Sequence, residues 1–268
     1  MFTLKSIPLC IFVMHIFALE TSTERLSLAI ISGEQTFARE IDAGQRHSEL
    51  AIDAIAEIFA EAQLRISDVD LIAFGQGPGS FVGVRIACGL AQGMAMGAGK
   101  KLAAVPTHMA LAEQAQRALP AAVNVLVAID ARMNEIYLAA YHRDSAQPSG
   151  WRVTIAPALV KPHELPDIST IGDGAWVGIG SAFDSGTLAT ALEDRYNHKI
   201  HTIIRTALPC ATDVAAIAQR QFARGVGLLN PAEAAPLYLR NNVAQTIEER
   251  AADKSRANLI SREAIIAA

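Results

Sequence analysis

The sequence contains little cysteine. Its three cysteines are Cys10, Cys88 and Cys210, and no two of them form a CxxC pair. Because the number is odd and the spacing is wide, neither a disulfide framework nor a cysteine zinc site is supported. This cysteine usage fits a reducing, intracellular compartment.

An excess of basic residues is also missing. Lys and Arg total 23 against 27 Asp and Glu, which gives a net charge of −4. Proteins that grip nucleic acid on their own usually carry a basic footprint, so this balance argues against such binding. Hydrophobic residues make up 51% and charged residues 19%, which favours a large core over disorder. The length of 268 residues suits one large domain or two lobes.

The first residues offer no membrane span. Lys5 followed by the apolar run from Ile7 to Leu19 resembles a short signal peptide, but no convincing small-residue cleavage site follows. The run is too short to cross a membrane. Since Met14 leads directly into a first strand, we expect Met14 to be the physiological start and residues 1–13 to be an upstream extension. A signal peptide is the alternative.

A glycine-rich turn joins a predicted strand to a predicted helix. The apolar run from Val69 to Phe74 reads as a buried strand, and residues 80–99 have helical spacing without proline. Gly77 and Gly79 allow backbone angles that a Cβ would forbid, and Ser80 is a good N-cap. The turn therefore either seats an anion at the helix N-terminus or simply makes a tight connection.

The helix after this turn carries a stripe of small residues. Gly89, Gly93 and Gly97 recur every four residues. Each glycine in a helix interior costs about 1 kcal/mol relative to alanine, so three of them require a compensating gain. Small side chains let another backbone approach closely. The stripe packs either on the protein's own sheet or on a partner subunit.

The chain also contains an internal repeat. Residues 17–29 align without a gap with residues 127–139, and the alignment places Glu20 at Asp130. Each segment reads as a strand, an acidic turn and an outgoing strand, which predicts two related lobes. The predicted strands are 15–19, 26–30, 36–41, 69–74, 137–142, 151–155 and 176–179, and the predicted helices are 48–62, 80–99 and 213–224. The glycine turn at 178–181 could approach an adenosine or simply punctuate a loop.

This layout resembles the actin/sugar-kinase/Hsp70 superfamily, an α/β class with two RNase H-like lobes. The expected parts are an N-terminal lobe at 14–118, a C-terminal lobe at 119–244 and a peripheral tail at 245–268, with the last helix of the second lobe able to pack back on the first. In that superfamily, paired acidic turns hold the phosphates and metal of a nucleotide. Both turns here lack glycine, which hinders close approach of phosphate. The candidate vestigial nucleotide-binding residues are Glu20, Thr21, Ser22, Gly77, Gly79, Ser80 and Asp130.

Four segments carry a resemblance to one family within this superfamily. They are residues 18–23 (ALETST), 77–85 (GPGSFVGVR), 128–137 (AIDARMNEIY) and 238–242 (YLRNN). Together they resemble the TsaB (YeaZ) family, accessory proteins of tRNA threonylcarbamoyladenosine (t6A) formation. The resemblance covers roughly residues 14–244.

The resemblance implies a non-catalytic relative of TsaD, which transfers the threonylcarbamoyl group to adenosine 37 of tRNA. TsaD-type proteins hold a metal with a His-x-x-x-His pair on a helix. Here His108 stands at the first position and Ala112 at the second, so we expect no metal site and no catalytic residue. His108 is then a structural or surface histidine. The alternative is a divergent enzyme of this fold, either a metallo-glycoprotease-like peptidase or a small-molecule kinase.

The resemblance also implies partners. TsaD and TsaE are expected to bind this chain, to contribute the ATP and metal that it lacks as cofactors of its own, and to bring it to tRNA only through the complex. A homodimer in isolation and a cytoplasmic location are expected. The family pairs through helices of the N-terminal lobe, which match the helices from Ser48 and Ser80. The candidate partner-binding residues are Leu50, Ala54, Ile58, Arg85, Gly89, Gly93 and Gly97.

Overall fold

The computed structural model describes residues 13–169, 171 and 174–240. Residues up to Leu237 belong to one compact unit, which holds every helix and strand described below, and a second unit begins at Tyr238. The expected extension at 1–13, apart from Val13, and the expected tail at 245–268 lie outside the described residues. The predicted domain boundaries therefore stay predictions.

The first sheet has six strands in the order β11-β5-β4-β1-β2-β3. Strands β1, β2 and β3 form an antiparallel meander, and β4 and β5 run parallel to β1. An apolar run predicts β1 and alternating apolar residues predict β2, and both strands are almost wholly buried. The bounds are β1 His15–Glu20, β2 Arg25–Ser32, β3 Gln35–Asp42, β4 Leu71–Gly77, β5 Lys101–Pro106 and β11 Leu228–Leu229.

The second sheet repeats this arrangement with five strands in the order β10-β9-β6-β7-β8. Again the first three strands are antiparallel, and the last two run parallel to the first. The bounds are β6 Asn124–Asp130, β7 Ile136–Arg143, β8 Trp151–Val160, β9 Trp176–Ile179 and β10 Ile200–Ile204. The shared strand order confirms the predicted α/β class with two RNase H-like lobes.

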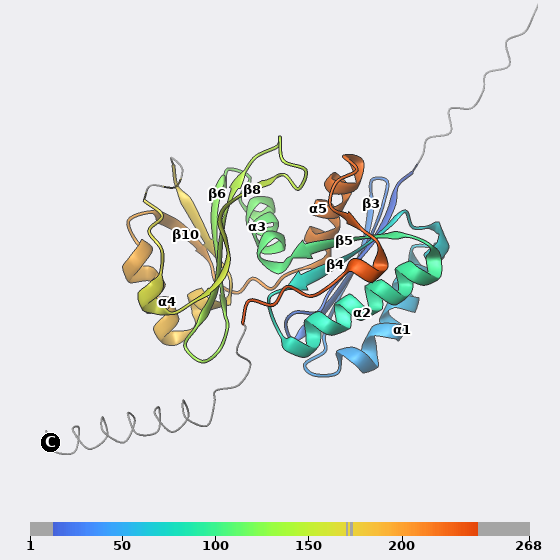
Figure 1. Cartoon of the computed structure of the whole chain (residues 1–268), viewed down its shortest axis with the longest axis horizontal. Helices are drawn as coiled ribbons and strands as arrows, with labels where there is room; N and C mark the ends of the chain where they lie inside the picture. The colour runs from blue at the N-terminus through green and yellow to red at the C-terminus, as the bar shows by residue number, and fades with distance from the viewer. Residues whose placement is uncertain (1–12, 170, 172–173, 241–268) are drawn as a thin grey trace, which may run out of the picture. The chain divides into compact units, whose positions relative to one another are not determined.

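The helices are divided between the outer faces and the space between the sheets (Figure 1). Helices α1 and α2 pack on the first sheet, whereas α3 contacts β4 and β5 of the first sheet as well as β6 of the second. Helix α5 follows β10 in the chain but packs on β1, β2 and β4 of the first sheet. The bounds are α1 His47–Glu61, α2 Phe81–Ala98, α3 Thr107–Ala118, α4 Gly186–Tyr196 and α5 Ala211–Ala223, with short 3₁₀ helices η1 Ile66–Asp68, η2 Pro162–Glu164, η3 Ser181–Asp184 and η4 Pro231–Glu233.

The structure corrects the gapless alignment of the two acidic turns. Glu20 pairs with Ser27 across β1 and β2, so the alignment requires Asp130 to pair with Tyr137. Asp130 instead pairs with Ile136, and the second turn is therefore one residue shorter. Because side chains alternate along a strand, a slip of one residue moves a side chain to the other face of the sheet.

Helix α2 buries its alanines and exposes its glycines. Ala87, Ala91 and Ala95 are fully buried in the core that faces the first sheet. Gly89, Gly93 and Gly97 are exposed, and a Cβ placed on any of them would meet nothing within 4 Å. The glycine stripe therefore does not pack on the protein's own sheet. By length and composition α2 also qualifies as a membrane span among the described residues, a weak criterion that core helices of soluble proteins satisfy too.

Two residues expected to bind a partner are instead part of the core. Ala54 and Ile58 on α1 are 3% and 0% exposed and pack with β1 and β2 residues. Their spacing marks the face of the helix that the first sheet covers, which corrects their assignment to a partner surface. Leu50 is partly buried against the same core, and Arg85 is exposed on α2.

Candidate functional site

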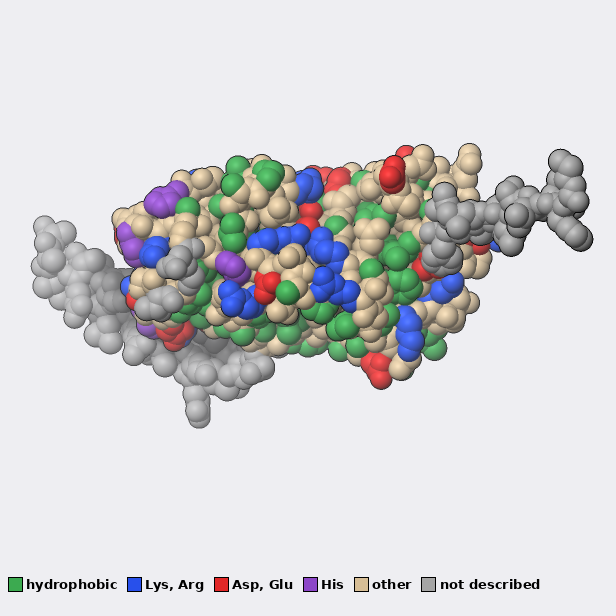
Figure 2. Space-filling view, turned by 90° about the horizontal axis from the view of Figure 1, so that it is seen from above, with side chains coloured by type: hydrophobic (Ala, Val, Ile, Leu, Met, Phe, Trp, Pro, Cys, Tyr) green, Lys and Arg blue, Asp and Glu red, His purple; other side chains and the backbone are tan. Residues whose placement is uncertain are grey.

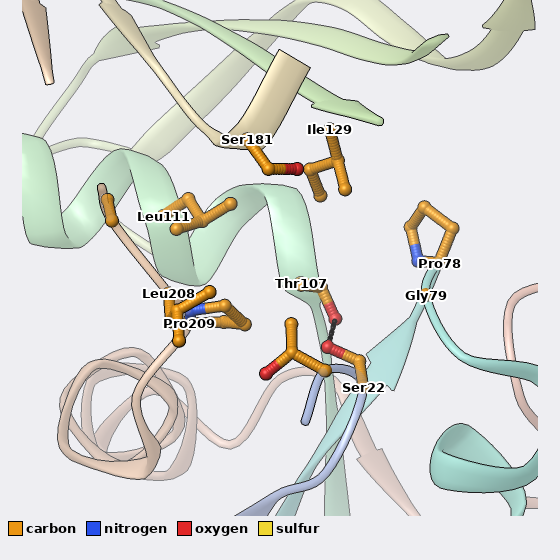
Figure 3. A pocket seen from close by; sticks show the side chains of 11 residues that line it. Ser22, Pro78, Gly79, Thr107, Leu111, Ile129, Ser181, Leu208 and Pro209 are labelled. Atoms are coloured by element: carbon orange, nitrogen blue, oxygen red, sulfur yellow. Dashed lines mark hydrogen bonds between the residues drawn. The ribbon is translucent and has the colours of Figure 1, made fainter. Parts of the chain in front are cut away.

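A cavity of about 540 Å³ opens between the lobes. It is lined by the first acidic turn (residues 22–24), the glycine-rich turn before α2 (residues 79–81), the turn that contains Asp130 (residues 129–132) and the start of η3. Its walls therefore come from both lobes. The lining residues are Ser22, Thr23, Glu24, Gly44, Gly79, Ser80, Phe81, Ile129, Asp130, Ala131, Arg132, Tyr137, Ser181 and Leu208. A small hollow shares part of this lining and is closed by Thr107, Leu111 and Pro209 (Figure 3).

Glycines in and after the glycine-rich turn pack directly against the first acidic turn. A Cβ on Gly75 would lie 1.9 Å from a carboxylate oxygen of Glu20, and a Cβ on Gly79 would lie 2.5 Å from the Ser22 carbonyl oxygen. Further on, a Cβ on Gly83 would lie 1.9 Å from the Thr21 carbonyl oxygen. Such distances leave no room for a side chain, so these three glycines are needed for packing between two parts of the chain.

Ser80 has the predicted role of N-cap. Its hydroxyl accepts a 3.3 Å hydrogen bond from the Gly83 N–H, and its own N–H donates to the Ser22 carbonyl oxygen at 2.7 Å. The second bond pairs the Ser80 N–H with the backbone of the first acidic turn, so this N–H is not available to a phosphate. The tight-turn interpretation therefore describes this segment better than a phosphate seat does, although Gly79 and Ser80 still border the cavity.

Glu20 is buried beneath the cavity. Its side chain accepts hydrogen bonds from the Ser22 N–H at 2.5 Å and from the Thr107 hydroxyl at 3.2 Å, and the residue is 1% exposed. Burial raises the pKa of its carboxyl, and these hydrogen bonds offset part of the increase. A carboxyl enclosed in this way stabilises the turn and does not reach the cavity.

Asp130 lies at the cavity but is directed toward the start of α4. Its N–H donates to the Ser181 hydroxyl at 3.0 Å, and its carboxylate accepts from the Ser185 hydroxyl at 2.9 Å. Ser185 is the N-cap residue of α4. Since Glu20 instead contacts Thr107 at the start of α3, the two acids do not form the pair across the cavity that the superfamily resemblance implies.

The tip of the Asp130 turn has an uncommon backbone. Arg132, Met133 and Asn134 all have φ between 57° and 64°, in the left-handed region that non-glycine residues seldom occupy. The Arg132 N–H donates to the Asp130 carboxylate at 2.7 Å, and the Glu135 N–H donates to the Arg132 carbonyl oxygen at 3.1 Å. These bonds hold the turn in place without glycine.

The structure brings together only part of the predicted nucleotide set. Ser22, Gly79, Ser80 and Asp130 line the cavity. Glu20, Thr21 and Gly77 are buried and do not line it, which corrects their placement. Glu20 and Thr21 pack against the glycine-rich segment, and Gly77 packs against Val84 and the Leu237 backbone. The cavity residues that the sequence did not single out include Thr23, Arg132 and Tyr137. Ser181 was indicated as a cavity residue only by the predicted glycine turn at 178–181.

The segment of α3 that corresponds to the His-x-x-x-His pair of TsaD-type proteins lies in the core. His108 and Ala112 on α3 are both 0% exposed. Burial lowers the pKa of His108 to about 4, and the backbone of Tyr137 offsets this in part. Neither ring nitrogen has a hydrogen-bond partner of good geometry among the described residues. Those residues also contain no group of three His, Cys, Asp or Glu side chains placed to hold a metal ion.

Comparison with known proteins decides the family. Residues 40–247 match the family described as TsaD, tRNA N6-adenosine threonylcarbamoyltransferase. The tRNA threonylcarbamoyladenosine biosynthesis protein TsaB of Escherichia coli (strain K12) is 34% identical over 234 residues, which are 86% of this chain and 96% of that protein. The chain belongs to the TsaD family, and within it to the TsaB proteins. TsaB of Haemophilus influenzae is 35% identical over 236 residues, 86% of this chain and 95% of that protein.

A solved TsaB-type structure has the same fold. YeaZ from Pseudomonas aeruginosa superposes with a TM-score of 0.71 at 30% identity and covers 84% of this chain and all of that chain. The TsaB relatives are named as proteins of t6A biosynthesis, so this chain is a protein of tRNA modification. The resemblance read from four sequence segments is thereby confirmed.

Proposed function

We propose that this chain is a non-catalytic partner subunit, which binds TsaD together with TsaE and supports threonylcarbamoyl transfer to adenosine 37 of tRNA. The observation that carries the proposal is the open glycine stripe of α2. Gly89, Gly93 and Gly97 face away from the core with no atom near a Cβ position. Since each costs about 1 kcal/mol within the helix, close approach of a second protein is the gain that would offset them.

The surface around the stripe is suited to such an approach. Val82 and Met96 on α2 are 62% and 69% exposed, and Ile52 on α1 is 60% exposed. Exposed apolar side chains beside open backbone are typical of a protein interface. Ile52, Val82 and Met96 therefore join Leu50, Arg85 and the three glycines as candidate contacts and replace the buried Ala54 and Ile58. A second copy of the chain would use this surface in a homodimer when TsaD is absent.

The proposal includes no cofactor of the chain's own. His108 is a single enclosed imidazole, and a zinc-type site needs several convergent donors. ATP and the metal are assigned to TsaD and TsaE, tRNA is met in the complex, and the chain works in the cytoplasm.

The test is t6A formation by TsaD, TsaE and tRNA with and without this chain. Gly93→Leu adds a side chain in the middle of the stripe and should abolish co-purification with TsaD while the melting temperature changes little. Gly93→Ala should keep most of the binding, and Thr190→Leu adds bulk at an exposed position of α4 as a matched control. Full t6A formation without the chain, or TsaD binding by Gly93→Leu, would contradict the proposal.

An enzyme of the same fold is the second candidate, because the cavity is large enough for a small ligand and carries Ser80 and Asp130. Metal analysis and an ATPase assay on the isolated chain separate the two functions. Turnover that disappears in Asp130→Ala would favour the enzyme.

A further inference from the structure

Three arginines contact the β7–β8 connection, residues 144–150, and a fourth pairs with an acid in the first turn of α5. This arginine cluster comprises Arg117 from α3, Arg143 from the end of β7, and Arg220 and Arg224 from the last turn and C-cap of α5. Figure 2 shows Lys and Arg side chains concentrated over the middle of the face seen from above, where α5 and this connection rise in Figure 1.

Contacts with shared partners hold the cluster together. Arg143 and Arg220 both donate to the Glu113 carboxylate, at 3.4 Å and 2.6 Å. Arg224 donates to the backbone carbonyl oxygens of Ser145 and Ala146 at 2.7 Å and 2.6 Å. Because these bonds fix the guanidinium groups, little side-chain entropy remains to be lost on binding a ligand.

The acids of the cluster lie beneath the arginines. Glu113 side-chain exposure is 9% and Asp213 side-chain exposure is 2%, whereas Arg117, which pairs with Asp213, has a side chain 59% exposed. A third acid, Asp144, is half-buried and accepts from the Ala146 N–H of its own turn. Two buried carboxylates thus lie beneath the arginines, and Asp144 is a third acid that is half-buried like Arg143.

The arginines also retain hydrogen-bonding capacity. A guanidinium carries five N–H donors. Arg117 uses two donor nitrogens on Asp213, both at 3.0 Å, and Arg224 uses two on the loop carbonyls. Their other N–H groups have no partner within the part of the chain that the structure describes. The planar fork of such a group matches a phosphate with two hydrogen bonds.

We propose that the arginine cluster binds the phosphate backbone of the RNA substrate. The TsaB relatives are named for the biosynthesis of threonylcarbamoyladenosine in tRNA, so the polyanion present in this pathway is an RNA. The negative net charge of the whole chain does not oppose this local contact, because charge is screened beyond about 10 Å at 0.1 M salt. The inference goes beyond the proposed subunit role, since it gives the chain a direct RNA contact of its own.

The test measures binding of a fluorescent tRNA transcript to the isolated full-length chain by anisotropy at 50 and 200 mM salt. Ser145 is exposed beside Arg224, and its hydrogen bond to Arg224 uses only the backbone. Ser145→Glu should weaken binding about threefold and Ser145→Lys should strengthen it about as much. Arg224→Gln should weaken binding about fivefold and reduce the salt slope by about one. Thr190→Glu and Thr190→Lys on α4 are the matched controls and should change nothing.

Three results would overturn the inference. The first is no binding at 50 mM salt up to 100 µM protein. The second is an equal response to the Ser145 and Thr190 variants. The third is competition by polyglutamate of matched charge as effective as competition by unlabelled tRNA, which would assign the cluster to an acidic protein. Since TsaD is absent from the assay, these results do not depend on the subunit role, and loss of TsaD binding in Gly93→Leu does not affect them.

Discussion

The hydroxyl of Thr21 donates a 2.7 Å hydrogen bond to the carbonyl oxygen of Gly83, which lies 62 residues later in the chain. The backbone of Thr21 in turn occupies the space that a side chain on Gly83 would need. The first acidic turn and the start of α2 are thus locked together from both sides. This contact explains the glycine at position 83 without any ligand.

Gly83→Ala should therefore destabilise the protein by about 3 kcal/mol, because the new Cβ meets backbone that cannot rotate away. Gly93→Ala is the matched control in the same helix and should stabilise the protein by about 1 kcal/mol, since its Cβ enters open space and alanine favours the helix. Urea unfolding followed by circular dichroism measures both. Similar free energies of unfolding for the two variants would refute the packing argument.

His108 should make the stability depend on pH. Its folded pKa is lowered to about 4 from 6.5, so the unfolded chain binds the proton first as the pH falls. The stabilising contribution is present above pH 6.5 and is lost as the pH falls toward 4, by about 3 kcal/mol in total. His108→Leu removes this contribution.

Urea midpoints of wild type and His108→Leu between pH 7 and pH 4 provide the measurement. The difference between the two proteins isolates His108 from Glu20, Glu40 and Asp213, whose carboxyl pKa values are raised by burial and which favour the folded state as the pH falls. Parallel profiles for the two proteins would show that His108 titrates normally.

Glu113 should be a major source of stability where α3 meets α5. Its carboxylate accepts from Arg220 at 3.0 Å and 2.6 Å and from the Trp151 indole N–H at 2.7 Å. Glu113→Gln leaves partly buried arginines without their counter-charge and should cost about 3 kcal/mol. The double variant with Arg220→Gln should cost less than the sum of the single changes, as thermal unfolding can show. Strict additivity would mean that the pair is not coupled.

The sequence predicted those elements whose signal is local. The apolar run at 15–19 marked β1, alternating residues marked β2, and Ser80 marked the start of α2. The N-terminal meander and the repeat of two lobes followed from such patterns. Strand β8 was predicted to end at Ile155 but continues to Val160, because pairing with β7 extends it past Pro157. Helix α4 and strand β10 were not predicted, since neither has a strong apolar period.

The site was less predictable, because its geometry depends on contacts between distant parts of the chain. Composition cannot show that Gly83 packs against the Thr21 backbone, or that the Thr107 hydroxyl donates to the Glu20 carboxylate. A one-residue difference in turn length also turned Asp130 away from the expected direction. Burial likewise decided between the two faces of α1, where Ala54 and Ile58 belong to the core.

The packing of α5 on the first sheet has a consequence for synthesis on the ribosome. Strands β1 and β2 are made first, but the helix that covers one of their faces begins at Ala211, and the edge strand β11 ends at Leu229. Nascent chains shorter than this expose an apolar sheet face and an unpaired strand edge, features that promote aggregation. The N-terminal lobe can therefore be completed only when nearly all of the compact unit has left the ribosome.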